Sequence, residues 1–156
     1  MNTYKNFIDK KICKQINNTM LGVNFPWFYK KNQTGKDSSF LFHCFFAENK
    51  INSTLYYLIE PLVKKFNYAQ IFSKAELKRP MKSNWHSDFD NLKSTPKSKT
   101  AIYYVNTNNG YTIFKNKKIK SEQNKMIVFN GDTKHKVKYQ TDKDTRIVIN
   151  FLYESI

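Results

Sequence analysis

The sequence predicts an α+β fold in which two helices cover one face of a β-sandwich or jelly roll. Apolar residues recur at helical spacing only within the first 68 residues, and short segments of strand character follow one another from residue 69 onward. The length of 156 residues suits one ordinary domain. We therefore expect residues 1–156 to form a single domain, with helical support from 1–68 and a jelly roll from 69–156.

Two helices and one strand are predicted in the first part of the chain. Residues 3–20 place an apolar residue at every fourth position, which is typical of an amphipathic helix: Tyr4, Ile8, Ile12, Ile16 and Met20. Residues 30–38 are polar and turn-like, and residues 40–46 predict a short buried strand. The second helix follows Ser53 as its N-cap, contains Pro61, and buries Leu55, Leu58, Ile59, Leu62 and Phe66.

The rest of the chain predicts about seven strands. Residues 100–105, 125–129 and 145–151 are rich in β-branched and aromatic residues, and Asn109-Gly110 and Asn130-Gly131 are turn signals. The predicted strands are 69–77, 84–89, 99–105, 111–114, 125–130, 135–139 and 145–153.

The net charge of +15 raises the question of a polyanionic partner. Arg79 and Arg146 are the only arginines, so 25 of the 27 basic residues are lysine. Arginine rather than lysine dominates the bidentate recognition of phosphates and bases. The sequence is also rich in the residues that an AT-rich genome encodes often. A functional basic surface and codon usage both remain explanations of the charge.

The cysteines and the absence of long apolar runs indicate the compartment. Cys13 and Cys44 do not form a C-x-x-C pair, which favours two reduced thiols. Residues 1–20 contain no apolar core of a signal peptide, and no run approaches the ~20 apolar residues that a membrane helix needs. We expect a soluble cytoplasmic protein without a membrane partner.

Two of the three histidines belong to one pattern of potential metal ligands. His86 and Asp88 are two residues apart, so on a strand their side chains point to the same face. His135 begins another predicted strand 49 residues later. Two imidazoles and one carboxylate form the facial triad that suits iron(II) with open positions, and the same set also serves zinc hydrolases. The third histidine, His43, has no partner in the pattern and is interpreted as structural.

Arg146 adds a fourth element. It stands 11 residues after His135 at the head of a mostly apolar strand, where a buried guanidinium needs an anionic partner. Its planar fork matches a carboxylate, either that of a ligand or that of a core residue such as Asp144. Alternation places Arg146, Val148 and Asn150 on one face of the strand.

These motifs, in this order, resemble the 2-oxoglutarate/Fe(II)-dependent oxygenase superfamily. The segments Ala101–Asn106 (AIYYVN) and Asn109–Phe114 (NGYTIF), followed by Val128–Asn130 and His135, are similar to strands of its prolyl-hydroxylase branch. The resemblance covers residues 69–153 and is close in pattern to small phage-encoded members, for which the compartment is the host cytoplasm. It implies a double-stranded β-helix, that is, a jelly roll backed by the two helices of the N-terminal half.

The resemblance also implies roles for individual residues. His86, Asp88 and His135 would hold Fe(II), and Arg146 would bind the distal carboxylate of 2-oxoglutarate together with the Tyr104 hydroxyl. Asn150 would line the same pocket. The cosubstrates would be 2-oxoglutarate and O2, the products succinate, CO2 and a hydroxylated C–H bond, and no separate acid–base residue is required.

Two positions depart from the family pattern. Related proteins have a tyrosine near residues 75–78 that helps to hold the cosubstrate, where this chain has Lys78. The nucleic-acid demethylase branch has a second arginine six residues after the first, where this chain has Leu152. A prolyl residue of a protein or peptide is therefore the substrate that the resemblance favours, and nucleic acid is the alternative for the same chemistry.

Two other classes of function remain open. One is a non-catalytic jelly-roll module that holds zinc, and the other is a basic structural nucleic-acid binder that needs neither His135 nor Arg146. The loops at 78–83 and 90–98 are expected to surround the active site and to determine what it accepts.

Overall fold

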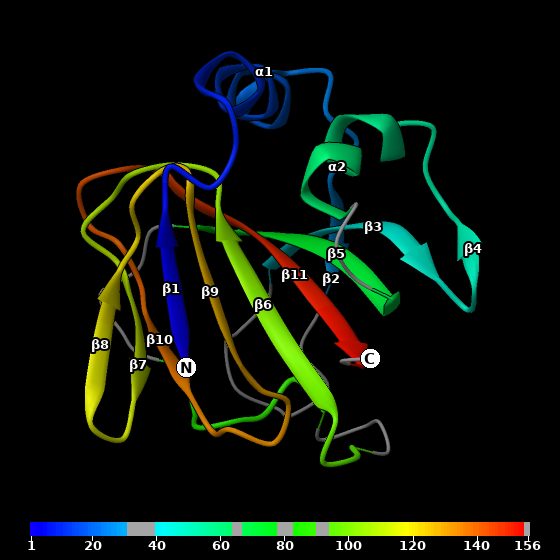
Figure 1. The fold of residues 1–156 in the computed structure, drawn as a ribbon. Helices are drawn as coiled ribbons and strands as arrows, with labels where there is room; N and C mark the ends of the chain where they lie inside the picture. Colours follow the sequence, from blue (N-terminus) through cyan, green and yellow to red (C-terminus); the bar gives the residue numbers. More distant parts are fainter. Residues whose placement is uncertain (31–39, 64–66, 78–82, 90–93, 155–156) are drawn as a thin grey trace.

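The computed structural model describes residues 1–30, 40–63, 67–77, 83–89 and 94–154, and for 67–69 it describes the backbone alone. Two antiparallel β-sheets face each other, and helices α1 and α2 lie beside the larger one, as Figure 1 shows. This arrangement is the predicted α+β jelly roll. The elements are β1 (Asn2–Lys5), α1 (Lys10–Leu21), β2 (Phe28–Lys30), β3 (Phe40–Ala47), β4 (Lys50–Ile51), α2 (Tyr56–Val63), β5 (Asn67–Leu77), β6 (Ser98–Tyr104), β7 (Tyr111–Phe114), β8 (Lys117–Lys120), β9 (Lys125–Asn130), β10 (Lys136–Lys138) and β11 (Thr145–Glu154).

The larger sheet has the strand order β1-β9-β6-β11-β5-β3-β2, with β4 paired to β3, and the smaller sheet has the order β10-β7-β8. Strand β11 is central, pairing with β5 on one side and with β6 on the other. It is buried continuously from Arg146 to Tyr153 because both of its faces are covered. In its register with β5, Arg146 lies opposite Glu76 and Asn150 lies opposite Phe72.

The outer face of the larger sheet packs against the two helices and forms the main hydrophobic core. Ile16 and Met20 of α1 belong to one cluster with residues of α2 and of the sheet: Leu58, Ile59, Leu62, Ile71, Tyr103, Ile147, Ile149 and Phe151. Burial of each such side chain stabilises the fold by about 1.5–3 kcal/mol. This core holds β11 rigidly from behind.

The inner face of the larger sheet looks toward the smaller sheet. Val148 of β11 and Phe114 of β7 join the two sheets in a second apolar cluster, which also contains Ile102, Tyr104, Ile119, Ile127 and Phe129. Alternation along β11 puts Arg146 and Asn150 on the same face as Val148, one on each side of it. The space between the sheets therefore has an apolar centre and two polar ends.

The predicted first helix was too long at its N-terminal end. Residues 2–5 are strand β1, in which Tyr4 pairs with Met126 of β9, and the helix begins only after Asp9, whose carboxylate accepts hydrogen bonds from the backbone N–H groups of Lys11 and Ile12. The β9 edge offers unpaired backbone groups, and pairing with them outweighs the helical pattern of residues 3–8.

Most of the other predicted elements agree with the structure. The second helix begins at Tyr56, three residues after the predicted N-cap Ser53, whose hydroxyl accepts a hydrogen bond from the Leu55 N–H. The predicted strand 84–89 is wrong: within it only His86 makes a β-bridge, to His135, and residues 88–89 form a turn, in which the Ser87 hydroxyl accepts from the Phe89 N–H. The strand β8 was not predicted, because three of its four residues are exposed lysines and only Ile119 is buried. Of the predicted turn at 30–38, Lys30 is the last residue of strand β2 and the rest lies outside the described residues. Residue 66 of the second helix and most of the predicted rim (78–82 and 90–93) also lie outside them. Within the described part, no helix is long and apolar enough to cross a membrane.

Candidate metal centre

The two histidines of the candidate site are joined by their backbones. His86 and His135 exchange two N–H···O=C hydrogen bonds of 2.9 Å each, in an isolated antiparallel bridge. Directly opposite residues of such a pair project their side chains to the same face. The two imidazole rings accordingly lie next to each other, with centroids 4.6 Å apart. The backbone thus brings together two residues that are 49 positions apart in the sequence.

Asp88 reaches the same face because it follows His86 by two residues. The intervening Ser87 points the other way, where its hydroxyl donates to the Gly131 carbonyl and accepts from the Phe89 N–H. These two bonds fix the backbone between the two ligand residues. The side chains of Asp88 and His135 are each only 3% exposed, so the site is enclosed on at least these two sides.

The hydrogen bonds of the histidines set which ring nitrogen faces the site. Nδ1 of His86 lies 3.0 Å from the Asn84 carbonyl, and Nδ1 of His135 lies 3.1 Å from the Thr133 carbonyl. A carbonyl oxygen only accepts, so each Nδ1 carries the proton and donates it. In the neutral ring this leaves the lone pair on Nε2, which is the arrangement found in most metal-binding histidines.

The donor atoms converge. One ligand atom from each of His86, Asp88 and His135 lies within 4.8 Å of the others, and Nε2 of His135 is 3.7 Å from Oδ2 of Asp88. Three donors that bind one ion at ~2.1 Å from one face of it lie about 3 Å apart, because adjacent bonds meet at about 90°. The donor atoms would therefore move toward one another by up to about 2 Å when an ion binds. The chemistry and spacing of the donor set fit a divalent transition metal.

The surroundings of His135 favour its neutral form. Burial is the main cause that lowers the pKa of His135, and the nearby Asp88 carboxylate acts in the opposite direction. The rings of Phe129 and Phe114 lie with their centroids 5.1 and 5.8 Å from the imidazole. A neutral imidazole in an apolar wall is the form that binds a metal ion.

Asn150 connects the central strand to this group. Its Nδ2 donates to Oδ2 of Asp88 at 3.4 Å, which orients the carboxylate. Its Oδ1 is buried and has no hydrogen-bond partner among the described residues. Because a carboxylate only accepts, the amide nitrogen must face Asp88. The orphaned oxygen is therefore free to accept from a group bound near the metal centre.

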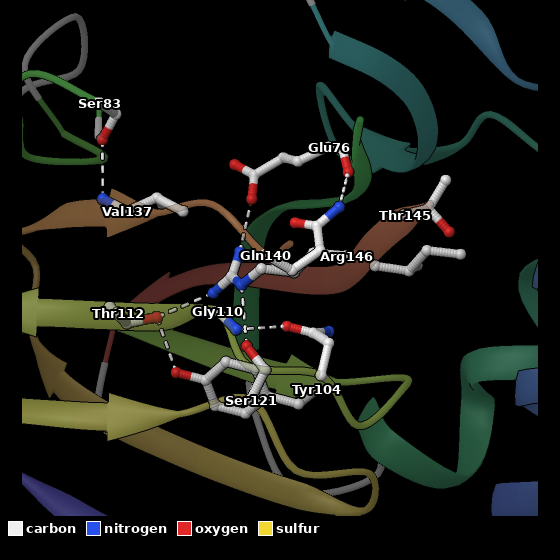
Figure 2. A network of polar contacts seen from close by, with 12 residues as sticks. Glu76, Ser83, Tyr104, Gly110, Thr112, Ser121, Val137, Gln140, Thr145 and Arg146 are labelled. Carbon is white, nitrogen blue, oxygen red and sulfur yellow. Dashed lines mark hydrogen bonds and ion pairs between the residues drawn. The ribbon is translucent and has the colours of Figure 1, made fainter. Parts of the chain in front are cut away.

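Arg146 lies at the other polar end of the inner face, in the network drawn in Figure 2. The residue is 1% exposed. Its NH1 donates to Oε2 of Glu76 at 2.6 Å, its Nε to the Ser121 hydroxyl at 2.8 Å, and its NH2 to the Thr112 hydroxyl at 3.0 Å. The guanidinium is thus held by residues of two strands, β5 and β7, and of the loop after β8, and its charge is neutralised by Glu76.

Tyr104 belongs to this network through its ring and its hydroxyl. The ring lies under the guanidinium at 5.5 Å from its centroid, and the hydroxyl donates to Thr112 at 2.7 Å. Burial raises the pKa of Tyr104, while the Arg146 charge acts against that rise. The tyrosine stays protonated and supports the arginine from below. Figure 2 shows both residues turned toward Thr112.

The structure brings the predicted residues into two groups. His86, Asp88 and His135 meet, with Asn150 beside them, and Arg146 and Tyr104 meet at the opposite end of the inner face. His43 is a buried structural residue, since its ring nitrogens contact the Pro26 carbonyl and the Ser53 hydroxyl, both at 2.9 Å.

Three members of the Arg146 network were missed: Glu76, Thr112 and Ser121. The core carboxylate expected for Arg146 is Glu76 rather than Asp144. The one signal for Glu76 was a carboxylate inside a predicted buried strand. Only the pairing register of β5 with β11, in which it faces Arg146, gives it a partner.

Comparisons with known proteins support the fold. No family model matches the sequence, and no curated protein is significantly similar to it. Among solved structures, a 2OG-Fe(II) oxygenase family oxidoreductase from Burkholderia pseudomallei is similar with a TM-score of 0.69 and 9% identity, over 96% of this chain and 82% of that one. A prolyl hydroxylase from Trichoplax adhaerens, in complex with a hypoxia-inducible-factor peptide fragment, has a TM-score of 0.66 and 12% identity, over 98% and 82%.

A third similar structure holds a small molecule instead of a peptide. The epimerase SnoN, in complex with Fe3+, alpha ketoglutarate and nogalamycin RO, has a TM-score of 0.67 and 8% identity, over 98% of this chain and 78% of that one. At these identities the similarity establishes the fold. The chain therefore has the jelly-roll fold that is shared by 2OG-Fe(II) oxygenases with peptide and small-molecule ligands.

Proposed function

We propose that the chain is an Fe(II)- and 2-oxoglutarate-dependent dioxygenase that hydroxylates a C–H bond. The observation that carries this proposal is the convergence of two Nε2 atoms and one carboxylate from His86, His135 and Asp88. Three protein ligands on one side leave the other coordination positions open, as two-histidine, one-carboxylate iron sites require. An Fe(II) ion with 2-oxoglutarate and O2 would supply the oxidising power for the hydroxylation.

The chain's own residues would position the reactants. Asn150 would hold the Asp88 carboxylate in place and offer its unpaired Oδ1 to a group bound at the centre. Phe114 and Phe129 would keep water away from His135. Arg146 would bind the distal carboxylate of the cosubstrate, supported by Thr112 and by the Tyr104 ring. The N–H and O–H donors of this cradle suit a carboxylate, and the Glu76 carboxylate already accepts from NH1 of Arg146.

For the substrate we propose a prolyl residue of a protein or peptide. The sequence resemblance to the prolyl-hydroxylase branch supports this, as does the similar fold of a prolyl hydroxylase that binds a peptide. A second candidate is single-stranded nucleic acid, which one observation favours. Trp85 precedes His86, is 46% exposed, and has the Lys136 ammonium 4.6 Å from its ring centroid. An exposed aromatic beside a cation is the kind of surface on which bases stack.

The chemistry is tested by adding Fe(II) and saturating 2-oxoglutarate to oxygen-free protein, recording the visible charge-transfer band, and then admitting O2 and measuring succinate. The wild type is expected to show the band and to form succinate. Asp88→Asn should lose both, because it removes an anionic ligand, whereas the matched control Asp132→Asn changes an exposed aspartate three residues before His135 and should keep both. A wild-type protein that holds zinc tightly and shows neither signal would contradict the proposal.

A further inference from the structure

The guanidinium of Arg146 already has a carboxylate partner inside the protein. Of its five N–H donors, Nε is bonded to Ser121, one on NH1 to Glu76 and one on NH2 to Thr112. The side chains of Arg146 and Glu76 are 2% and 9% exposed. The pair lies opposite in the β5–β11 register, so the backbone itself brings the carboxylate to the arginine.

This arrangement matters for any ligand that spans the two polar ends of the inner face. Arg146 and Asn150 are four residues apart on β11, which corresponds to about 13 Å along the strand. Asn150 contacts Asp88 at the metal centre. A 2-oxo acid bound there would extend its distal end toward Arg146. A distal carboxylate would meet a neutral Arg146–Glu76 pair rather than a free cation.

Two carboxylates that share one guanidinium repel each other, most strongly in a buried site. We propose that Glu76 is a specificity-determining residue that occupies the carboxylate position on Arg146 and so removes most of the advantage of 2-oxoglutarate over 2-oxo monoacids. This inference rests on the proposed function, because it assumes that a 2-oxo acid binds at the metal centre. It makes Glu76 a competitor that a distal carboxylate must displace.

Two ligands isolate the effect. 2-Oxoglutarate and 2-oxopentanoate have the same chain length and the same metal-chelating end, and differ only in the distal group, carboxylate or methyl. Their dissociation constants are measured by calorimetry with Mn(II)-loaded protein, so that no turnover occurs. In the wild type we expect 2-oxoglutarate to bind less than about tenfold more tightly than 2-oxopentanoate, since a free charge-assisted pair would give about tenfold to hundredfold.

Glu76→Gln keeps the shape and an acceptor for NH1 but removes the charge. This variant should raise the preference for 2-oxoglutarate at least about tenfold above that of the wild type, through tighter binding of the diacid alone. The matched control Glu48→Gln makes the same change at a carboxylate whose side chain is 84% exposed and which pairs with Lys50, and it should leave the preference unchanged.

The outcomes separate this inference from the function on which it rests. If the preference of Glu76→Gln for 2-oxoglutarate stays within about tenfold of that of the wild type, the proposed role of Glu76 is wrong, and the proposed oxygenase function is unaffected. If neither ligand binds to the metal-loaded wild type, the proposed function fails and the inference fails with it. If Glu76→Gln does not fold, the wild-type preference decides: a value below about tenfold supports the role, and a higher value overturns it.

Discussion

The Arg146–Glu76 pair makes a quantitative prediction about stability. Removing one partner of a buried ion pair costs about 3–5 kcal/mol, because the other charge stays buried and unpaired. Arg146→Met also removes the donor that bonds to the buried Ser121 hydroxyl, so we expect it to lower the free energy of unfolding by about 5 kcal/mol. Glu76→Met leaves Arg146 its bonds to Ser121 and Thr112, so we place it at about 3 kcal/mol.

The double variant should lose much less than the sum of the two single variants. Apolar residues of similar size then replace the ion pair, so no unpaired charge stays buried. The remaining cost, about 2 kcal/mol, comes from the hydroxyls of Ser121 and Thr112, which no longer accept hydrogen bonds from Arg146. Urea unfolding of the wild type and the three variants gives the free energies directly. For a chain of this length, each kcal/mol also lowers the melting temperature by about 2–4 °C.

A matched cycle on an exposed pair provides the control. Lys50 and Glu48 are 3.8 Å apart with side chains 66% and 84% exposed, and their coupling should be within roughly 1 kcal/mol. If the Arg146–Glu76 coupling is equally small, or if each single variant costs less than about 1 kcal/mol, the pair is solvated and the reasoning about its burial is wrong.

Three further predictions concern other parts of the fold. A Cβ at Gly131 would lie 2.7 Å from the Phe89 ring, so Gly131→Ala should destabilise the protein by about 1–3 kcal/mol. Because Phe89 follows the ligand Asp88, the same variant should weaken Mn(II) binding in calorimetry, and an unchanged affinity would show that Phe89 does not position Asp88. Tyr104→Phe should cost about 0.5–1.5 kcal/mol in urea unfolding, since the ring stays under Arg146 and only the bond to Thr112 is lost; a cost above about 3 kcal/mol would mean that the hydroxyl has a larger role. Burial raises the pKa of Tyr153 to about 12, so the hydroxyl loses its proton at a lower pH in the unfolded chain than in the folded one. The free energy of unfolding should therefore fall as pH rises from about 10 to about 12, and it should fall less steeply in Tyr153→Phe; identical curves would contradict the raised pKa.

The sequence predicted those parts of the fold in which one local pattern dominates. Strand β11 was predicted because most of its residues are β-branched or aromatic, and the second helix because its apolar residues recur at helical spacing after Ser53. Strand β1 was missed because its pairing with β9 is a contact between segments about 120 residues apart, which local periodicity does not report. Strand β8 was missed because exposed lysines hide its single buried residue.

The candidate site divides in the same way. The i, i+2 spacing of His86 and Asp88 placed both on one face as expected, although Asp88 lies in a turn and not in a strand. Their approach to His135 follows from the isolated β-bridge between His86 and His135, which local patterns do not report. The partner of Arg146 was not predictable in the same manner. Asp144 is near in sequence, but Glu76, 70 residues away, is the carboxylate that the sheet register places opposite.

The central claim is that His86, Asp88 and His135 hold one iron ion and leave part of its coordination open. An oxygen-free crystal structure of the Fe(II)-loaded protein, with anomalous scattering at the iron edge, tests it most directly. We predict one ion per chain, bound at about 2.0–2.2 Å by Nε2 of both histidines and by one oxygen of Asp88. An ion bound at other residues, or none at this group, would contradict the account.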